Sequence, residues 1–424
     1  MLPKSISKKI PTRIRLIPLL LYKVIISIIS IIKSLWRYLT FIPLTSILFF
    51  VAFVKRWSAK TEKPRLLWAS SIINDHYFSS ALSKNFESKS FTKVVYHINN
   101  ASDFDIVLPK SYLKKFTLCL KLLKGYDIVL FSFNGAYLTV LGFPKLEPIL
   151  FKIARIKTVV MAYGSDVALY DKLNNKSYAH TLNIHYPLTF KTRKKNEEYI
   201  NRWLKYGDVI MPNMFHEEGF FRWDIISPNP LAIDIDKFKE VDEEKIGGNF
   251  IVAHSPNHRY IKGTEFLISA IDNLKRKGLN VELKIIEKMN NVEVQKLLKY
   301  KANLLVEKLV GPSYALNGIE GMSCGLPVIS SINTDDWSAY MKLFYRYSYL
   351  EECPIVSANQ DTVERQIELL YHNPKLCNEL GVAGRKYVEK YHSYDAARFL
   401  FGNIIDKIWY NGSVELKNIY HPLN

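Results

Sequence analysis

Two basic residues stand in a short polar loop that follows an apolar run. The run Phe250–His254 has the length of a buried strand, and Arg259, Lys262 and Gly263 come after it, where a helix-like stretch begins. Loops after parallel strands lie at the carboxyl edge of the sheet, where open α/β sheets bind ligands. A guanidinium, an ammonium and a helix N-terminus at that edge would stabilise phosphate charge. We therefore single out this loop as a candidate ligand-binding site, the alternative being a solvated basic loop.

A carboxylate occupies a similar position after another strand-length run. The apolar residues Asn303–Val306 are followed by a loop with Gly311 and Pro312, and a helix-compatible stretch then carries Glu320. A Gly-x-Pro stop and a further strand complete the unit. This order predicts backbone N–H groups and one fixed carboxylate at the same sheet edge. The alternative is a buried βα unit in which Glu320 is only a surface carboxylate.

The string from Glu320 to Ile329, EGMSCGLPVI, resembles the donor-binding signature of retaining family-4 glycosyltransferases, which have the GT-B fold. In that family the second Glu of the signature holds the ribose of the nucleotide, so the resemblance implies this role for Glu320. The first Glu of the family falls here on Pro312. Some members instead carry an acidic residue thirteen positions before the second Glu, and Glu307 stands there. Which sugar is held, and how, stays open.

The resemblance also assigns a role to the basic loop after Phe250–His254. Arg259 and Lys262-Gly263 match the family's Arg and Lys-Gly, which implies that they bind the diphosphate of the donor and stabilise its leaving charge. Two elements of one family in the right order support each other. The candidate donor-binding residues are His254, Asn257, Arg259, Lys262, Gly263, Glu307, Ser313, Tyr314, Asn317 and Glu320.

Candidate acceptor-side residues follow two strands of the first half. Tyr163-Gly164-Ser165-Asp166 comes directly after the apolar run Thr158–Ala162, and the resemblance implies that it lies near the meeting point of donor and acceptor. We expect Asp166 to hold an acceptor hydroxyl and to act in catalysis with Arg259 and Lys262; the alternative is an Asp that caps the next helix. Asn74 and His76, in the polar stretch after Arg65–Ala69, complete the acceptor-side set. We expect no metal and no cofactor.

The elements that must carry these residues alternate between strands and helices from Arg65 onward. Strands are expected at Arg65–Ala69, Lys93–His97, Asp105–Leu108, Tyr126–Phe131, Thr158–Ala162 and Asp208–Pro212, with helices between them. This rhythm predicts α/β architecture with two Rossmann-like, doubly wound parallel sheets that face a cleft. A chain of 424 residues has room for two domains and an appendage. We expect a domain at 61–238, a second at 239–395, and a C-terminal helix at 396–424 that returns to the first.

The first 60 residues differ from the rest in charge. They hold eleven Lys and Arg and no Asp or Glu, out of a net charge of +18 for the chain. Long apolar runs separate these cations, which suits an anionic bilayer better than nucleic acid. Tyr38–Val54 is uncharged for 17 residues, the short limit for crossing a bilayer. We expect residues 1–60 to anchor the protein, through 1–57, to the cytoplasmic face of a membrane as a re-entrant or interfacial segment; the alternative is a buried helical hairpin.

These observations predict a glycosyltransferase that moves a sugar from a nucleotide-sugar to a lipid-linked or membrane-proximal glycan acceptor. The resemblance implies retention of anomeric configuration without a metal, and polysaccharide or glycolipid assembly as the setting. The four scattered cysteines give no metal-binding or disulfide pattern, and no nucleic-acid motif is found. Two alternatives remain: a sugar-nucleotide epimerase or hydrolase of the same fold, and a non-catalytic membrane scaffold.

Overall fold

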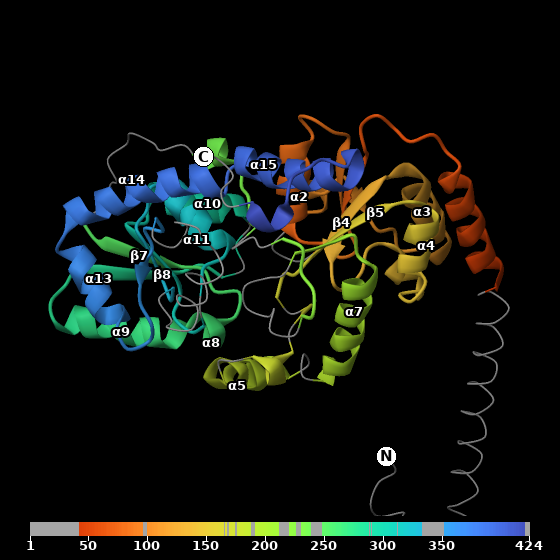
Figure 1. Cartoon of the computed structure of the whole chain (residues 1–424). Coiled ribbons are helices and arrows are strands. Elements are labelled where there is room, and N and C mark those ends of the chain that lie inside the picture. Colours follow the sequence, from red (N-terminus) through yellow and green to blue (C-terminus); the bar gives the residue numbers. More distant parts are fainter. Residues whose placement is uncertain are drawn as a thin grey trace, which may run out of the picture.

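The structure, a computed structural model, describes residues 42–95, 100–164, 166–167, 169–173, 176–187, 191–211, 220–225, 230–238, 248–287, 289, 291–311, 313–332 and 352–419. Figure 1 shows two α/β units side by side, each built on its own sheet. The prediction of two parallel-sheet α/β units is therefore confirmed. The predicted anchor residues 1–41 lie outside the described part of the chain.

The sheet of the first unit has its strands in the order β3-β2-β1-β4-β5-β6, and every pairing is parallel. Its strands are β1 (Leu66–Trp68), β2 (Ser88–Thr92), β3 (Ile106–Val107), β4 (Ile128–Ser132), β5 (Lys157–Met161) and β6 (Val209–Met211). The strand order reverses between β1 and β4. Such a reversal opens a crevice at the carboxyl ends of the strands, which is where doubly wound sheets bind ligands.

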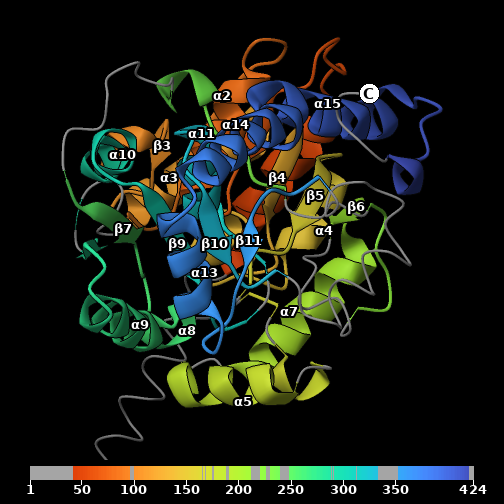
Figure 2. The same ribbon diagram turned by 90° about the vertical axis from the view of Figure 1, so that its left-hand side faces the viewer.

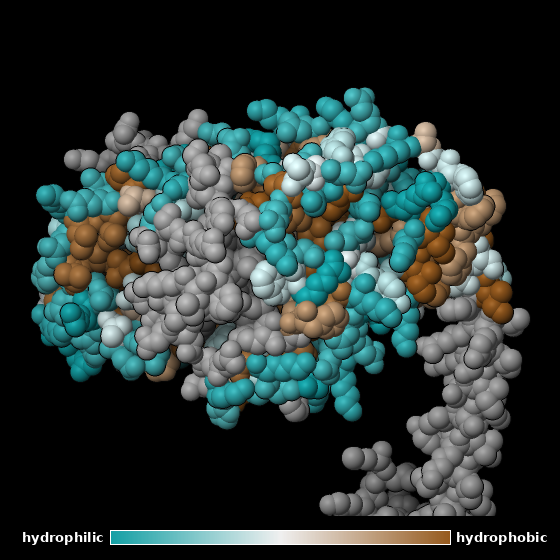
Figure 3. All heavy atoms as spheres, viewed as in Figure 1, coloured by the Kyte–Doolittle hydropathy of each residue, from teal (hydrophilic) through white to brown (hydrophobic). Residues whose placement is uncertain are grey.

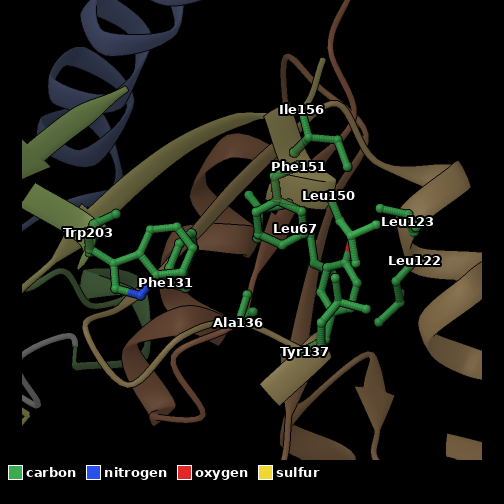
Figure 4. Close-up of a cluster of buried hydrophobic side chains, with 14 of the residues drawn as sticks. Leu67, Leu122, Leu123, Phe131, Ala136, Tyr137, Leu150, Phe151, Ile156 and Trp203 are labelled. Carbon is green, nitrogen blue, oxygen red and sulfur yellow. The ribbon is translucent and has the colours of Figure 1, made fainter. Parts of the chain in front are cut away.

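Helices α2 (Ile73–Leu82), α3 (Tyr112–Gly125), α4 (Glu147–Ile153) and α7 (Arg193–Tyr206) cover both faces of this sheet and supply its core. Helix α5 (Lys176–His185) lies away from the sheet, towards the second unit. Figure 4 shows aromatic side chains between β4 and α7, where the ring centroids of Phe131 and Trp203 are 4.6 Å apart. Phe151 and Tyr137 pack beside them, with 5.5 Å between ring centroids. These buried rings fix the strands whose ends form the candidate site.

The second unit has a sheet in the order β11-β10-β9-β7-β8, also parallel throughout. Its strands are β7 (Phe250–His254), β8 (Val281–Ile285), β9 (Leu304–Lys308), β10 (Val328–Ser330) and β11 (Val356–Ser357). Its helices are α8 (Arg259–Lys262), α9 (Thr264–Arg276), α10 (Asn291–Tyr300), α11 (Leu316–Ser323), α13 (Val363–Tyr371) and α14 (Pro374–Tyr391). Here the strand order reverses between β7 and β9, so the loops after these two strands flank a second crevice.

The chain crosses back to the first unit at its end. Helix α15 (Tyr394–Ile405) packs against α2, and Phe401 contacts both Trp68 and Phe78 with 4.8 Å between ring centroids. Just before it, the ring of His392 bonds to the Leu231 carbonyl oxygen at 2.8 Å and to the Tyr314 hydroxyl at 2.9 Å. The end of α14 is thereby tied to the segment between the units and to the loop before α11.

One strand prediction is wrong. The run Lys93–His97 was expected to be the second strand, but β2 is Ser88–Thr92, and residues 93–95 follow it without strand structure. The polar residues of β2 are buried and bonded: Ser88 accepts the Trp68 indole N–H at 3.0 Å, and Ser90 contacts Asp105. Hydrogen bonds of this kind remove the penalty for burying hydroxyls, so the more apolar neighbouring run was the wrong choice.

Residues 42–56 form a helix with two different sides. Leu48 and Ala52 are fully buried against the first unit, and Lys55 bonds to Asp127 at 3.0 Å. Phe50 and Phe53 on the same helix are 67% and 54% exposed. Among the described helices, none is both long and apolar enough to cross a membrane. The sequence also favours a short helix at Phe215–Phe221 and a linker at 228–230; residues 215–219 and 228–229 lie outside the described residues.

Candidate functional site

A cavity of about 890 Å³ lies at the carboxyl edge of the second sheet. Its walls come from the loops after β7, β9, β10 and β11 and from α5 of the first unit. The lining residues are Tyr178, Thr181, His185, Arg259, Tyr260, Gly263, Glu265, Phe266, Leu309, Val310, Gly311, Ser331, Ser357, Ala358, Asn359, Gln360 and Thr362. Size and position are those of a small-molecule site in an α/β protein.

Arg259 is the cation on the wall of this cavity. It begins α8, directly after the β7 loop, and its side chain is 40% exposed. The guanidinium donates to both carboxylate oxygens of Glu287, at 2.8 and 3.1 Å, and to Glu265 at 3.1 Å. These carboxylates raise the pKa of Arg259 further above its usual value. Glu265 and Glu287 hold the charged guanidinium of Arg259 at the cavity. Because the three side chains are partly exposed, a ligand can reach the guanidinium.

Lys262 and Glu307 form a buried pair next to the cavity. The ammonium donates to Glu307 Oε1 at 2.9 Å, and the same carboxylate accepts the backbone N–H of Ala315, at 2.9 and 3.0 Å. Burial works to raise the pKa of Glu307, but Lys262 and Lys308 nearby hold it below its usual range. An ionised carboxylate therefore joins the end of β9, the loop after β7 and the start of α11.

Helix α11 carries two more of the predicted donor residues, Asn317 and Glu320. Asn317 lies in its first turn, and the buried amide nitrogen of its side chain has no hydrogen-bond partner among the described residues. An unsatisfied donor of this kind costs free energy unless a ligand or water accepts from it. Glu320 lies one turn further along and is 5% exposed. Asn257, in the loop before α8, is exposed.

Three of the predicted donor residues hold the site together from inside. His254 is fully buried, and its ring nitrogens contact the Val306 carbonyl oxygen at 2.7 Å and Thr264 Oγ1 at 2.9 Å. Burial lowers the pKa of His254 to about 4, so the ring is neutral. Ser313 is fully buried, and Tyr314, 3% exposed, bonds to His392. These three residues fix β7, β9 and the α11 loop and present no free group to the cavity.

The first unit closes the cavity through α5. His185 stacks on Tyr260 of α8 with ring centroids 4.5 Å apart, and Figures 1 and 2 both show α5 beneath α8. Gly311 lies so close to Tyr178 that a β-carbon on the glycine would stand 2.5 Å from the ring. The backbone of Gly311 also has a positive φ of 79°, which favours glycine. The backbone of the loop therefore packs directly on the Tyr178 ring of α5.

At the carboxyl edge of the first sheet, the carboxylate of Asp166 is hydrogen-bonded to backbone N–H groups. It is 5% exposed, and its carboxylate accepts the N–H of Phe133 at 3.2 Å and of Tyr163 at 3.0 Å. Burial raises the pKa of Asp166 to about 6. Gly164, between Tyr163 and Asp166 in the chain, has a φ of 132°. Ser165 lies outside the described residues. Asp166 thus ties the ends of β4 and β5 together.

The polar residues with unused bonding capacity are next to Asn74 and His76. Asp75 is fully buried in the first turn of α2; its Oδ2 accepts the Ser71 N–H at 2.7 Å, while Oδ1 has no partner among the described residues. Ser70 Oγ is also buried and lies beside Asp75 and Tyr163, whose pKa values it works to lower. Asn74 is 2% exposed, with its nearest bonds to Pro230 and Ala232 at 3.5 and 3.4 Å. His76 is half-buried, and burial lowers its pKa.

A third buried carboxylate lies at the same edge. Glu147 is fully buried and accepts the N–H groups of Ala136 at 2.9 Å and Leu138 at 2.7 Å. Burial raises the pKa of Glu147 to about 7 and lowers that of Lys93, whose ammonium donates to the Gly135 carbonyl oxygen. These groups flank the crevice between β1 and β4.

Sequence reasoning missed Asp75 and the α5 wall. An Asp in the first turn of a helix is an ordinary favourable residue, and no local pattern signals that this one is fully buried. Tyr178, Thr181 and His185 come from a polar and basic stretch, 170–207, in which the sequence predicts a loop and a helix but no site residue. The described residues hold no group of three or more His, Cys, Asp or Glu fit for a metal ion; Asp335 and Asp336 lie outside them.

Comparison with known proteins gives structural similarity only. No family model and no curated protein matches the chain. An alpha-glucosyltransferase in complex with UDP and a 13-mer DNA has a TM-score of 0.49 and 14% identity, covering 81% of this chain and 98% of that one. MurG from Acinetobacter baumannii has a TM-score of 0.36 and 11% identity, covering 81% and 98%. UDP-GlcNAc 2-epimerase from Neisseria meningitidis, bound to UDP-GlcNAc, has a TM-score of 0.41 and 11% identity, covering 77% and 98%. At these values the likeness supports no functional conclusion.

Proposed function

We propose that this protein is a glycosyltransferase of the GT-B type. A nucleotide-sugar binds at the carboxyl edge of the second sheet, and the acceptor binds at the facing edge of the first. The observation that carries the proposal is the cavity of about 890 Å³ at the point where the second sheet reverses its strand order, with the Arg259 fork on its wall. Family-4 enzymes are the group that the sequence resembles.

Donors at and beside the cavity favour a diphosphate as ligand. Arg259 lines the cavity as a fork shared with Glu265 and Glu287, while Lys262, paired with Glu307, and the unsatisfied amide of Asn317 at the start of α11 lie outside the cavity lining. As the glycosidic bond breaks, negative charge grows on the leaving diphosphate, and fixed donors stabilise it without reorganising. We propose that Arg259 and Lys262 do this, that Glu320 holds the ribose, and that transfer proceeds with retention and without a metal.

The acceptor side is proposed at the crevice between β1 and β4. Asp75 Oδ1, which has no partner among the described residues, and the buried Ser70 Oγ beside it are polar atoms of the kind that a substrate hydroxyl satisfies. The acceptor is proposed to be lipid-linked or close to the membrane. The eleven cations of residues 1–60 and the exposed Phe50 and Phe53 support a position on an anionic membrane surface.

The test is a thermal-shift series with UDP, GDP and their sugar conjugates on the full chain. A ligand that binds only the folded state raises Tm, and we expect at least one of these nucleotides to do so. Arg259→Ala and Glu320→Gln should lose most of the shift. Lys277→Ala is the matched control: Lys277 is also an exposed cation of the second unit paired with two carboxylates, Glu364 and Glu368, but it does not line the cavity.

Two results would contradict the proposal. If no nucleotide shifts the wild type, the donor site does not exist and a scaffold role is favoured. If Lys277→Ala loses as much of the shift as Arg259→Ala, the effect is one of general charge. Release of free sugar from the donor without any acceptor requirement, or its epimerisation, would favour the epimerase or hydrolase alternative over transfer.

A further inference from the structure

A second cavity, of about 530 Å³, lies at the amino edge of the first sheet. Four of its lining residues stand at the starts of strands: Arg65 before β1, Asp127 before β4, Lys157 at the first position of β5, and Asp208 before β6. Because these strands are parallel, the cavity is on the edge opposite the crevice proposed for the acceptor. We call it the basic pocket; sugar transfer makes no use of it.

The lining of the basic pocket is strongly cationic. It contains nine Lys and Arg side chains and two carboxylates. Both carboxylates are already engaged: Asp127 accepts from Lys55 at 3.0 Å and from Arg65 at 2.8 Å, and Asp208 accepts from Lys157 at 3.2 Å. Neither is available to neutralise the remaining cations.

Six cations of the basic pocket form no ion pair with any described residue: Arg56, Lys60, Lys124, Lys152, Arg155 and Lys205. Lys60 is held in place, since its ammonium donates to the Trp409 carbonyl oxygen at 2.6 Å and lies over the indole ring. Like charges gathered around a concave surface raise the local concentration of anions. Arg and Lys together are also the residues that bind phosphate oxygens.

Two further features of the lining favour an anion. Arg155 connects α4 to β5 with a positive φ of 56°, a conformation that glycine would adopt without steric cost. The strained backbone therefore carries a guanidinium at the pocket, and strain of this kind is typical of functional positions. Trp409 also lines the pocket, and its buried indole N–H has no partner among the described residues.

The rim of the basic pocket is apolar where the N-terminal helix ends. Trp57 stands between the lining residues Arg56 and Ser58, is 73% exposed, and packs edge-on against Phe53 with ring centroids 6.0 Å apart. Figure 3 shows apolar residues along the right-hand edge of the molecule, over residues 42–56 and the elements beside them. Exposed Trp and Phe beside cations are the pattern of a surface that lies at the headgroup level of a bilayer.

We propose that the basic pocket binds the phosphate-bearing headgroup of an anionic lipid while Trp57 and Phe53 enter the bilayer surface beside it. The headgroup would fix the first unit on the membrane by the edge opposite its acceptor crevice. This inference rests on the membrane position given under the proposed function and is independent of sugar transfer.

The test measures binding of the full chain to phosphatidylcholine vesicles with and without phosphatidylglycerol. The pocket variant is Lys152→Gln with Lys205→Gln. Its control is Lys114→Gln with Lys121→Gln, which removes the same charge from exposed lysines of α3 outside the pocket. Residues 1–41 attract anionic vesicles in every variant, so the difference between the two pairs is the readout. We expect binding of the pocket variant to be roughly ten-fold weaker than that of the control.

Arg155→Gly is a second pocket variant, chosen so that weaker binding cannot be explained by loss of folding. It removes a pocket charge and relieves the positive φ, so the fold should be as stable as wild type or more stable, while anionic-vesicle binding should still fall about five-fold. Equal binding by pocket and control variants would overturn the proposal, because attraction would then come from overall charge alone.

Inorganic phosphate distinguishes the two sources of the anion. If phosphate raises Tm in the control but not in the pocket variant, and vesicle binding does not differ, a soluble phosphate occupies the site and the lipid proposal is overturned. If both readouts differ, the headgroup assignment is supported. The UDP thermal shift, measured on the same variants, should be unchanged; its absence in all of them would count against the proposed donor site and leave the pocket result standing.

Discussion

At the scale of single residues, Asp75 has the most unusual environment among the polar groups of the candidate site. The carboxylate is fully buried, one of its oxygens has no partner among the described residues, and burial raises the pKa of Asp75 to about 7. A helix N-terminus stabilises a nearby negative charge, yet here burial outweighs that effect. At neutral pH the group is thus poised between its acid and its base form.

Asp75→Asn should reveal this as a pH-dependent gain in stability. The folded pKa lies above the unfolded one, so the wild type is fully relieved of the burial penalty below about pH 4 and bears it increasingly as the pH rises through 7. The variant bears no such penalty. Its free energy of unfolding, from urea titrations between pH 4 and 8, should match the wild type at the acid end and exceed it by up to a few kcal/mol at the alkaline end.

Asp105→Asn is the matched control, with the opposite sign. Burial tends to raise the pKa of Asp105, but the Ser90 N–H and Lys89 hold it below the usual range. The wild-type stability from this carboxylate is present above its unfolded pKa and is lost as the pH falls, so the variant should be less stable at neutral pH and equal in acid. If the difference in free energy of unfolding between wild type and Asp75→Asn did not vary with pH, burial would not raise the pKa of Asp75.

At the scale of elements, the contact between the loop after β9 and helix α5 forms part of the cavity wall. Gly311 and Tyr178 both line the cavity, and there is no room for a β-carbon between them. Two costs should follow from Gly311→Ala: about 1–2 kcal/mol for the left-handed backbone, and displacement of α5 by the added methyl group. We expect lower stability and a reduced UDP thermal shift.

Gly278→Ala separates the two costs. Gly278 has a φ of 88° with nothing within 4 Å of an added β-carbon, so it should lose stability only through its backbone and should keep the full UDP shift. Adding Tyr178→Leu to Gly311→Ala should restore part of the shift by relieving the overlap. Equal UDP shifts in the two glycine variants would show that α5 does not shape the donor site.

Local sequence predicted the second unit better than the first. The strand Phe250–His254 has the same bounds as β7, because a continuous apolar run flanked by polar loops is what a strand buried on both faces requires. In the first unit Ser88 and Ser90 bury their hydroxyls through bonds to Trp68 and Asp105. Those partners lie in β1 and just before β3, so no local pattern could have identified β2.

The candidate site was predictable only where its residues follow strands directly. Arg259 could be assigned from its loop position, and the structure has it on the cavity wall. The same reasoning assigns His254 to the donor. Strand β9 lies beside β7, however, and the ring of His254 bonds to the Val306 carbonyl oxygen of β9 in the interior. The α5 wall depends on contacts between distant segments, which periodicity and motif spacing do not encode.

At the scale of the whole molecule, the last helix joins the two units. Helix α14 covers the second sheet, α15 packs on α2 of the first, and His392 between them bonds to both the connecting segment and the α11 loop. The crossing therefore links the position of the donor loop to that of the acceptor crevice. Relative movement of the units has to be accommodated at this joint.

Phe401→Ala tests whether this crossing stabilises the first unit. Phe401 is fully buried between Trp68 and Phe78, so truncation should cost roughly 3–5 kcal/mol. Phe399→Ala, on the same helix but 39% exposed, should cost far less and is the control. Hydrogen exchange should show protection lost in β1 and α2 while β7 and β9 keep theirs, since the second sheet has its own core. If both sheets lost protection equally, the two units would unfold as one. If neither sheet lost protection, α15 would not stabilise the first unit. Either result would contradict a helix that stabilises one unit from the end of the other.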